Sequence, residues 1–140
     1  MSLRTATTAG VTRSITVLKD VYDYGNSDFF VALWDSQIPK GGFISLGMFN
    51  LSSVFGTPGN LVPFPWSMCA RAIGDEVQFK VWPTADAVPA WGDAQYGVTV
   101  TIPAPDLATW DAPGIPGWYV GHLGAGQSAV FTSLSTSTLP

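Results

Sequence analysis

The chain has 140 residues, a length typical of a single domain, and 46% of them are apolar, which is enough to build a hydrophobic core. Only 11% are charged, against about 25% in ordinary soluble domains. Charge normally prevents surfaces from associating, so its shortage here favours contact with neighbouring subunits. The six basic residues are scattered through a chain of net charge −4, which argues against nucleic acid binding because phosphates are held by clustered Lys and Arg.

The two ends of the chain are small, polar and without a periodic pattern. Residues 1–13 are therefore predicted to form an N-terminal arm, and residues 135–140 a C-terminal tail. An arm of this composition has little reason to be ordered alone, and we expect a neighbouring subunit to order it, with Leu3, Arg4 and Arg13 as the contact residues. The first residues lack the apolar stretch of a secretion signal, and no later run approaches the roughly 18 apolar residues of a membrane span. The protein is expected to fold in the cytoplasm where it is made.

Short apolar runs separated by glycine and proline predict β-strands rather than helices over the next part of the chain. Ile15, Val17 and Val21 share one face of the first strand. Asp28–Trp34 is almost wholly apolar, as in a strand that is covered on both faces. Gly42–Phe49 is predicted as the next strand.

Three oxygen-bearing side chains, Asp23, Asn26 and Asp28, lie close together before the second of these strands. Calcium prefers such ligands, but the intervening Gly-Asn-Ser is equally good turn chemistry. The regular alternation of an EF-hand is missing. We favour the turn and predict no metal site, while calcium stays open as the alternative.

The clearest local unit is a hairpin over Ser67–Trp82, whose two-residue turn is Gly74-Asp75. One face of its second strand is apolar, and its residues are Val77, Phe79 and Val81. The other face is polar except for Trp82 and is expected to contact solvent.

The single cysteine, Cys69, lies on the first strand of this hairpin. One cysteine excludes an internal disulfide and a thiolate zinc cluster. Its neighbours Met68 and Ala70 indicate a buried, unreactive thiol.

Three later strands are predicted over Tyr96–Ile102, Gly117–Leu123 and Gln127–Leu134. Two stretches that contain several prolines, Gly56–Pro65 and Pro103–Pro116, are predicted to be irregular loops packed over the domain. The spacing of the strands favours an all-β fold.

We predict a single antiparallel β-sandwich, of the jelly-roll type, over residues 14–134. No internal repeat and no second domain is visible in the sequence.

The stretch Arg71–Asp93 resembles the C-terminal part of laminin-G-like, concanavalin-type sandwich domains. In that pattern a strand ends in a basic residue, an apolar residue and tryptophan, and a second tryptophan follows a proline in the next loop. The matching residues here are Lys80, Val81, Trp82, Pro89 and Trp91. Val88 stands where the pattern has an acidic residue, which removes any polar role from that position.

The resemblance extends to Pro116–Phe131, which looks like the closing segment of the family, and covers roughly the C-terminal half of the chain. Full members are generally longer. They occur in actinobacterial surface proteins and in virions of phages that infect such hosts. The resemblance implies a sandwich fold, then carbohydrate or surface binding, and then a place on a phage tail or capsid.

The sequence offers little for catalysis. Retaining glycoside hydrolysis needs two paired carboxyl groups, and Glu76 is the only glutamate. His122 is the only histidine and is predicted to be structural, because no Gly-x-Ser-x-Gly elbow accompanies it. Gly124–Ala129 fits the spacing of a dinucleotide loop but is followed by strand-forming rather than helical sequence. We predict no enzyme and no cofactor.

Aromatic residues carry the one functional indication. A flat indole beside an acidic or amide group is the usual way to hold a sugar, and Trp82, Trp91 and Asp93 fit that description. Trp118 and Tyr119 are further candidates, since Trp and Tyr also anchor protein interfaces. For the first group we favour packing over sugar binding: its tryptophans clamp the proline-rich loop or pack at an interface.

We therefore predict a non-enzymatic structural protein of a bacteriophage virion, displayed on the particle as a minor tail protein or a capsid decoration protein. Its expected partners are other virion proteins and further copies of itself, with contact to host-surface carbohydrate left open. Nucleic acid and membranes are not expected partners. The alternative is a free-standing carbohydrate-binding module.

Overall fold

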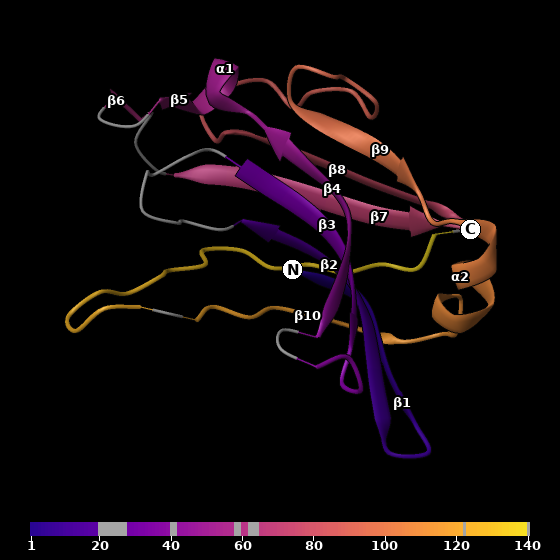
Figure 1. The fold of residues 1–140 in the computed structure, drawn as a ribbon. Coiled ribbons are helices and arrows are strands. Elements are labelled where there is room, and N and C mark those ends of the chain that lie inside the picture. The colour runs from indigo at the N-terminus through magenta and orange to yellow at the C-terminus, as the bar shows by residue number, and fades with distance from the viewer. Residues whose placement is uncertain (20–27, 40–41, 58–59, 62–64, 122, 140) are drawn as a thin grey trace.

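The computed structural model describes residues 1–19, 28–39, 42–57, 60–61, 65–121 and 123–139. Over these residues the protein is an all-β sandwich of two antiparallel sheets, one of five strands and one of three (Figure 1). The predicted fold class is confirmed.

The larger sheet has the strand order β10-β1-β2-β3-β4. Its strands are β1 (Ser2–Thr8), β2 (Val11–Lys19), β3 (Asp28–Asp35), β4 (Phe43–Asn50) and β10 (Ile115–Gly117). The order places the short last strand at one edge and β4 at the opposite edge. The strands predicted over Asp28–Trp34 and Gly42–Phe49 are confirmed as β3 and β4.

The smaller sheet has the order β7-β8-β9. Its strands are β7 (Trp66–Ile73), β8 (Glu76–Pro83) and β9 (Gly97–Thr101). The predicted hairpin is confirmed as β7 and β8, and Gly74 takes the positive φ of +57° that its turn requires. As predicted, Val77, Phe79 and Val81 point into the core and are buried.

Aromatic side chains fill the space between the sheets. The Phe29 ring lies 5.7 Å from Phe79 and 6.2 Å from Phe55, measured between centroids. Phe55 comes from the short helix α1 (Ser52–Phe55) and contacts Trp66 at 4.3 Å. Each such fully buried ring stabilises the fold by about 1.5–3 kcal/mol.

Two segments expected to be irregular contain regular structure. Gly56–Pro65 includes the short paired strands β5 (Gly56–Thr57) and β6 (Asn60–Leu61). Pro103–Pro116 includes the helix α2 (Ala104–Trp110), whose Trp110 is buried. Proline in the first turn favours a helix start rather than a loop, which explains the wrong prediction.

The residues expected to form an N-terminal arm lie within the five-stranded sheet. Ser2–Thr8 pairs with β2 on one side and with β10 on the other. The turn between β1 and β2 is Ala9-Gly10, and both residues have positive φ, as a two-residue hairpin turn requires. Residues 2–8 therefore belong to the sandwich.

The strands predicted over Gly117–Leu123 and Gln127–Leu134 are not formed. Only Gly117 belongs to a strand, as the last residue of β10. No described residue from Trp118 to Leu139 lies in a helix or a strand. We call these described residues, 118–121 and 123–139, the C-terminal segment.

Candidate functional site

Two of the predicted site residues, Trp82 and Trp91, contact one buried lysine on β8, and Asp93 lies in the same loop as Trp91. The Lys80 ammonium lies 4.6 Å from the centroid of the Trp91 ring and 5.6 Å from that of Trp82. It also donates a hydrogen bond to the carbonyl oxygen of Pro89 at 2.5 Å. These contacts tie the loop after β8 to the sheet.

A second cation contacts the same indole. The guanidinium carbon of Arg71, on β7, lies 4.3 Å from the centroid of Trp91. Its Nε donates to Oε1 of Gln78 at 2.7 Å, which fixes the direction of the guanidinium. A cation over an indole contributes about 0.5–2 kcal/mol, depending on how far it is removed from water.

Asp93 shapes the loop rather than facing a ligand. Its carbonyl oxygen accepts hydrogen bonds from the amides of Tyr96 and Gly97, both at 3.1 Å. Its Oδ1 accepts the amide of Gln95 at 3.0 Å. Gly97 is required here, because a Cβ would collide with the carbonyl oxygen of Phe79.

The arrangement around Lys80 is better suited to clamping a loop than to binding a sugar. Trp82 is only 5% exposed, so the prediction that it contacts solvent is wrong; the loop held by Lys80 and Trp91 folds back over this face. Sugar stacking needs an open ring face, and Trp91 is half-buried with two cations against it. The geometry favours the packing alternative.

The other two predicted aromatics, Trp118 and Tyr119, begin the C-terminal segment. The Trp118 ring lies 5.4 Å from that of Phe131, while Tyr119 is 77% exposed. Between Trp118 and Phe131 the chain reverses at a turn, in which the amide of Gln127 donates to the carbonyl oxygen of Gly124 at 3.0 Å. In Figure 1 this gold-to-yellow chain runs out from β10, reverses and returns.

The C-terminal segment is uncharged and apolar at the same time. No Asp, Glu, Lys or Arg follows Asp111. Of the fifteen exposed large apolar residues of the described chain, eight lie in this segment. They are Trp118, Tyr119, Val120, Leu123, Val130, Phe131, Leu134 and Leu139. Disordered segments are normally charged and poor in such residues, so this composition is typical of an interaction surface.

The residues expected to bind a neighbour through the N-terminal arm contact their own chain. Leu3 packs against the core. Arg4 forms an ion pair with Asp111 at 2.9 Å, and Nε of Arg13 donates to Oδ2 of Asp35 at 2.8 Å.

Asp35 is held in its charged form by its surroundings. The amide of Gln37 donates to its Oδ1 at 2.8 Å, and the Arg13 guanidinium adds a second hydrogen bond and a favourable charge. Together they hold the pKa of Asp35 below its usual value, although partial burial opposes the shift.

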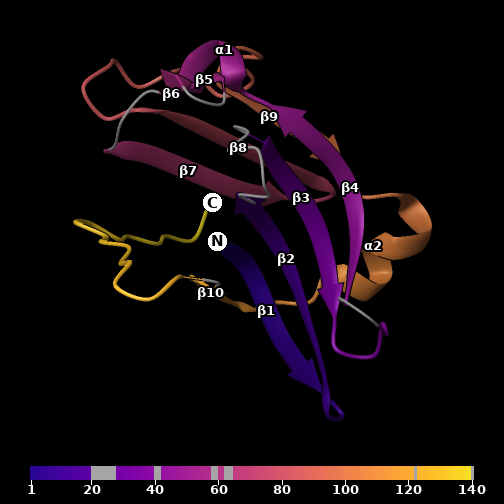
Figure 2. The same cartoon turned by 60° about the vertical axis from the view of Figure 1, so that its left-hand side comes forward.

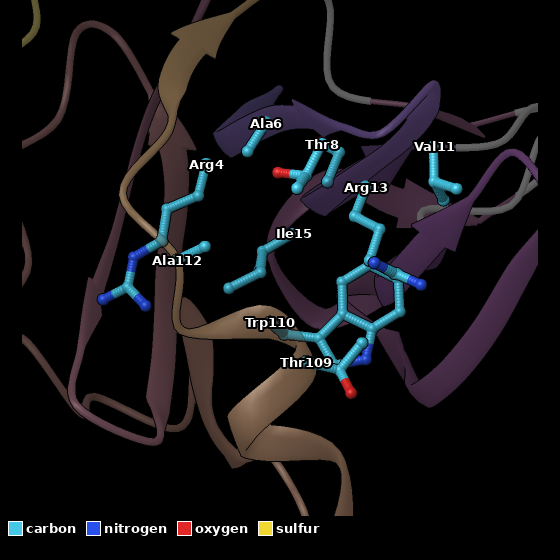
Figure 3. Close-up of a pocket in the computed structure, with 10 residues that line it drawn as sticks. Arg4, Ala6, Thr8, Val11, Arg13, Ile15, Thr109, Trp110 and Ala112 are labelled. Atoms are coloured by element: carbon cyan, nitrogen blue, oxygen red, sulfur yellow. The ribbon is translucent and has the colours of Figure 1, made fainter.

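Figure 3 shows a small hollow between Arg4, Arg13 and Trp110. Its volume of about 30 Å³ has room for about one water molecule. Ligand pockets are about 300–1,000 Å³, so this hollow cannot hold a substrate or a sugar.

Several remaining expectations concern single residues. Cys69 is exposed rather than buried, because its neighbours Met68 and Ala70 pack against the core and successive side chains of a strand point to opposite faces. Asp28 accepts a hydrogen bond from Nδ2 of Asn50 at 2.6 Å. Val21, Asp23, Asn26 and His122 lie outside the described residues.

The described residues contain no cluster of three His, Cys, Asp or Glu side chains that could hold a metal ion. None of the helices described is long and apolar enough to cross a membrane. No protein-family model, curated protein or solved structure was found to match the chain.

Sequence reasoning missed the C-terminal segment as an exposed surface. Its alternating apolar residues predict paired strands, and the prediction assumed that the partner strand lies in the same chain. The signal that could have identified it is the absence of charge after Asp111, since exposed segments of a monomer normally carry charge.

Proposed function

We propose that this protein is a non-enzymatic structural subunit that works by assembling with its neighbours through the C-terminal segment. The observation that carries the proposal is the concentration of eight exposed apolar side chains in a segment without charge. Exposed apolar side chains gathered in one segment mark sites of protein contact. The rigid sandwich positions the start of the segment, because β10 is hydrogen-bonded to β1.

We further propose that the assembly is a bacteriophage virion, in which the protein serves as a minor tail or capsid decoration protein. This part rests on the resemblance of Arg71–Asp93 to laminin-G-like virion domains. The two-sheet sandwich and the loop clamped at Trp91 are compatible with it. The expected partners are copies of the chain and other virion proteins.

The alternative is a carbohydrate-binding module. Of the candidate aromatics, Tyr119 is the one whose ring is largely open, with Trp118 beside it. The candidates Trp82 and Trp91 offer less, because one is buried and the other faces two cations. A glycan site would therefore have to use the same segment that we assign to assembly.

Assembly is tested by light scattering behind size-exclusion chromatography over a range of protein concentrations. We expect masses that are multiples of 14.8 kDa. Val130→Asp should shift the protein toward the monomer, whereas Val88→Asp, in the exposed loop after β8, should leave the mass unchanged. A monomer that binds a glycan array and loses that binding in Tyr119→Ala would support the module instead.

The virion setting is tested by mass spectrometry of particles purified from a culture that carries the gene. A constant ratio of this chain to the major capsid protein across a density gradient is the expected result. Absence of the chain from purified particles would refute the virion role while leaving assembly itself intact.

A further inference from the structure

The outermost strand β4 has an unprotected edge. Among the described strands it is hydrogen-bonded to β3 alone, and its sequence FISLGMFN contains neither charge nor proline. Phe43, Ile44 and Met48 are exposed along it. Natural edge strands are usually blocked by Lys, Pro, short length or bulges, and β4 has only one extra residue, Leu46, where its pairing with β3 shifts register. Part of β4 lies close to β9 of the other sheet, but no ladder of hydrogen bonds joins these two strands, so the outer backbone groups of β4 are available to another strand.

The C-terminal segment contains a stretch whose sequence favours a strand but which is not paired in the single chain. Gln127–Leu134 reads QSAVFTSL, whose alternation and β-branched residues predict a strand. The backbone hydrogen bond of the Gln127 turn lies within the segment, and none joins the segment to the rest of the described chain. Gln127–Leu134 and β4 are both eight residues long, uncharged and unpaired on at least one edge.

The donor and the acceptor lie on opposite sides of one domain. The sheet order puts β10, from which the segment leaves, four strands away from β4. Figure 2 shows β4 on the right and the orange-to-yellow segment on the left. The other nearby edge, β7, is partly occupied, because Nη2 of Arg4 donates to the carbonyl oxygen of Ala72 at 3.5 Å. If β4 is the acceptor, it must therefore belong to a second molecule.

We infer that Gln127–Leu134 of one copy adds as a strand to the free edge of β4 in a second copy of this chain. The inference rests on the proposed assembly function and names its partner and its contact. Main-chain hydrogen bonds supply the pairing, and the alternating side chains supply the selectivity. Because donor and acceptor lie on opposite sides, the contact is head-to-tail, and it closes into a ring or continues as a filament.

The proposed pairing also brings apolar side chains together. At about 200 Å² for an aromatic and about 100 Å² for an aliphatic side chain, the exposed parts amount to roughly 230 Å² on the donor (Val130, Phe131 and Leu134) and roughly 200 Å² on the acceptor (Phe43, Ile44 and Met48). Stable specific interfaces begin at about 1,200 Å², so the main chains of both strands and the rest of the C-terminal segment have to add to the contact.

Proline substitutions test for backbone pairing on the donor. We expect Thr132→Pro or Ser133→Pro to raise the dissociation constant about tenfold or more, because one of two adjacent amides must face the acceptor. Both positions are irregular in the single chain, so its fold is unaffected. Thr136→Pro, beyond the pairing stretch, is the matched control and should keep the wild-type mass.

A lysine substitution tests the acceptor. Met48→Lys should also shift the protein toward the monomer, since a lysine at a strand edge blocks the addition of another strand. Ile73→Lys on β7 and Val88→Lys are controls for an exposed apolar residue elsewhere. Hydrogen exchange should show Phe43–Asn50 and Gln127–Leu134 losing protection together on dilution.

The outcomes separate this inference from the function on which it rests. A dissociation constant that is unchanged from wild type in Met48→Lys and in both proline variants would refute the β4 contact and leave the assembly function standing. Protection of Gln127–Leu134 that does not change with concentration would place its partner within the same chain, which also refutes the inference. A wild-type chain that is monomeric at every concentration and absent from purified particles would overturn both proposals.

Discussion

Removing the aromatic face of Trp91 should measure the strength of the loop clamp. Trp91→Leu keeps an apolar side chain but removes the indole that lies 4.3 Å from the Arg71 guanidinium carbon and 4.6 Å from the Lys80 ammonium. Two cation–π contacts of about 1 kcal/mol each, together with the smaller apolar area, give an expected loss of about 2–3 kcal/mol in the free energy of unfolding. In a domain of this size such a loss lowers Tm by roughly 5–12 °C.

Urea unfolding, followed by the fluorescence of the remaining tryptophans, gives the free energy directly. Trp118→Leu is the control, because Trp118 is exposed and its ring packs against that of Phe131 rather than against a cation. A double-mutant cycle with Arg71→Met should show a coupling of about 1 kcal/mol. If Trp91→Leu costs no more than the control, or the coupling is zero, the two cations do not stabilise this loop and our interpretation of the site is wrong.

Three further predictions follow from single contacts. Gly97→Ala should destabilise the protein by about 3 kcal/mol or more, seen as a lower Tm by circular dichroism, because its Cβ meets the Phe79 backbone. Asp35→Asn should make the free energy of unfolding depend less on pH in the acid range. Folding lowers the pKa of Asp35, so the carboxylate stabilises the fold at pH values above its unfolded pKa. This contribution is lost as the pH falls through the folded pKa. A stability curve with the same acid side in Asp35→Asn would contradict this. Cys69 should react fully with a thiol reagent in the native protein, since it is exposed; reaction only after unfolding would show that it is covered.

The parts of the fold that the sequence predicts correctly are the ones with local signals. The β7–β8 hairpin is visible because Gly74-Asp75 is a turn and the apolar residues of β8 alternate around it. β1 is missed because most of its residues are Ser, Thr and Ala, which give no alternation of large apolar and polar side chains. Its outward side chains pair through hydroxyl groups instead, as between Thr7 and Thr12 at 2.8 Å. Binary patterning cannot detect such a strand.

At the candidate site, too, the sequence reveals what is local in the chain and misses what depends on tertiary contacts. The sequence brings Trp82 and Trp91 into one neighbourhood, because they flank a short loop. It does not reveal that Lys80 is buried, since that depends on the carbonyl oxygen of Pro89, which a tertiary contact brings to the ammonium. Lysine is almost never fully buried without a partner, so the default expectation of an exposed side chain fails here.

The composition of the C-terminal segment has a consequence for assembly. A single copy leaves Val130, Phe131 and Leu134 exposed in a stretch without charge or proline from Gln127 to Leu134, and a segment of that kind is an aggregation hazard in a free monomer. Adding charge would remove the hazard but would also prevent strand addition. An acceptor of matching length on a second copy covers the apolar side chains and satisfies the unpaired amides and carbonyls of both strands at once. A segment that serves only as a loose tail has no need of this composition, whereas a strand that pairs between copies requires it.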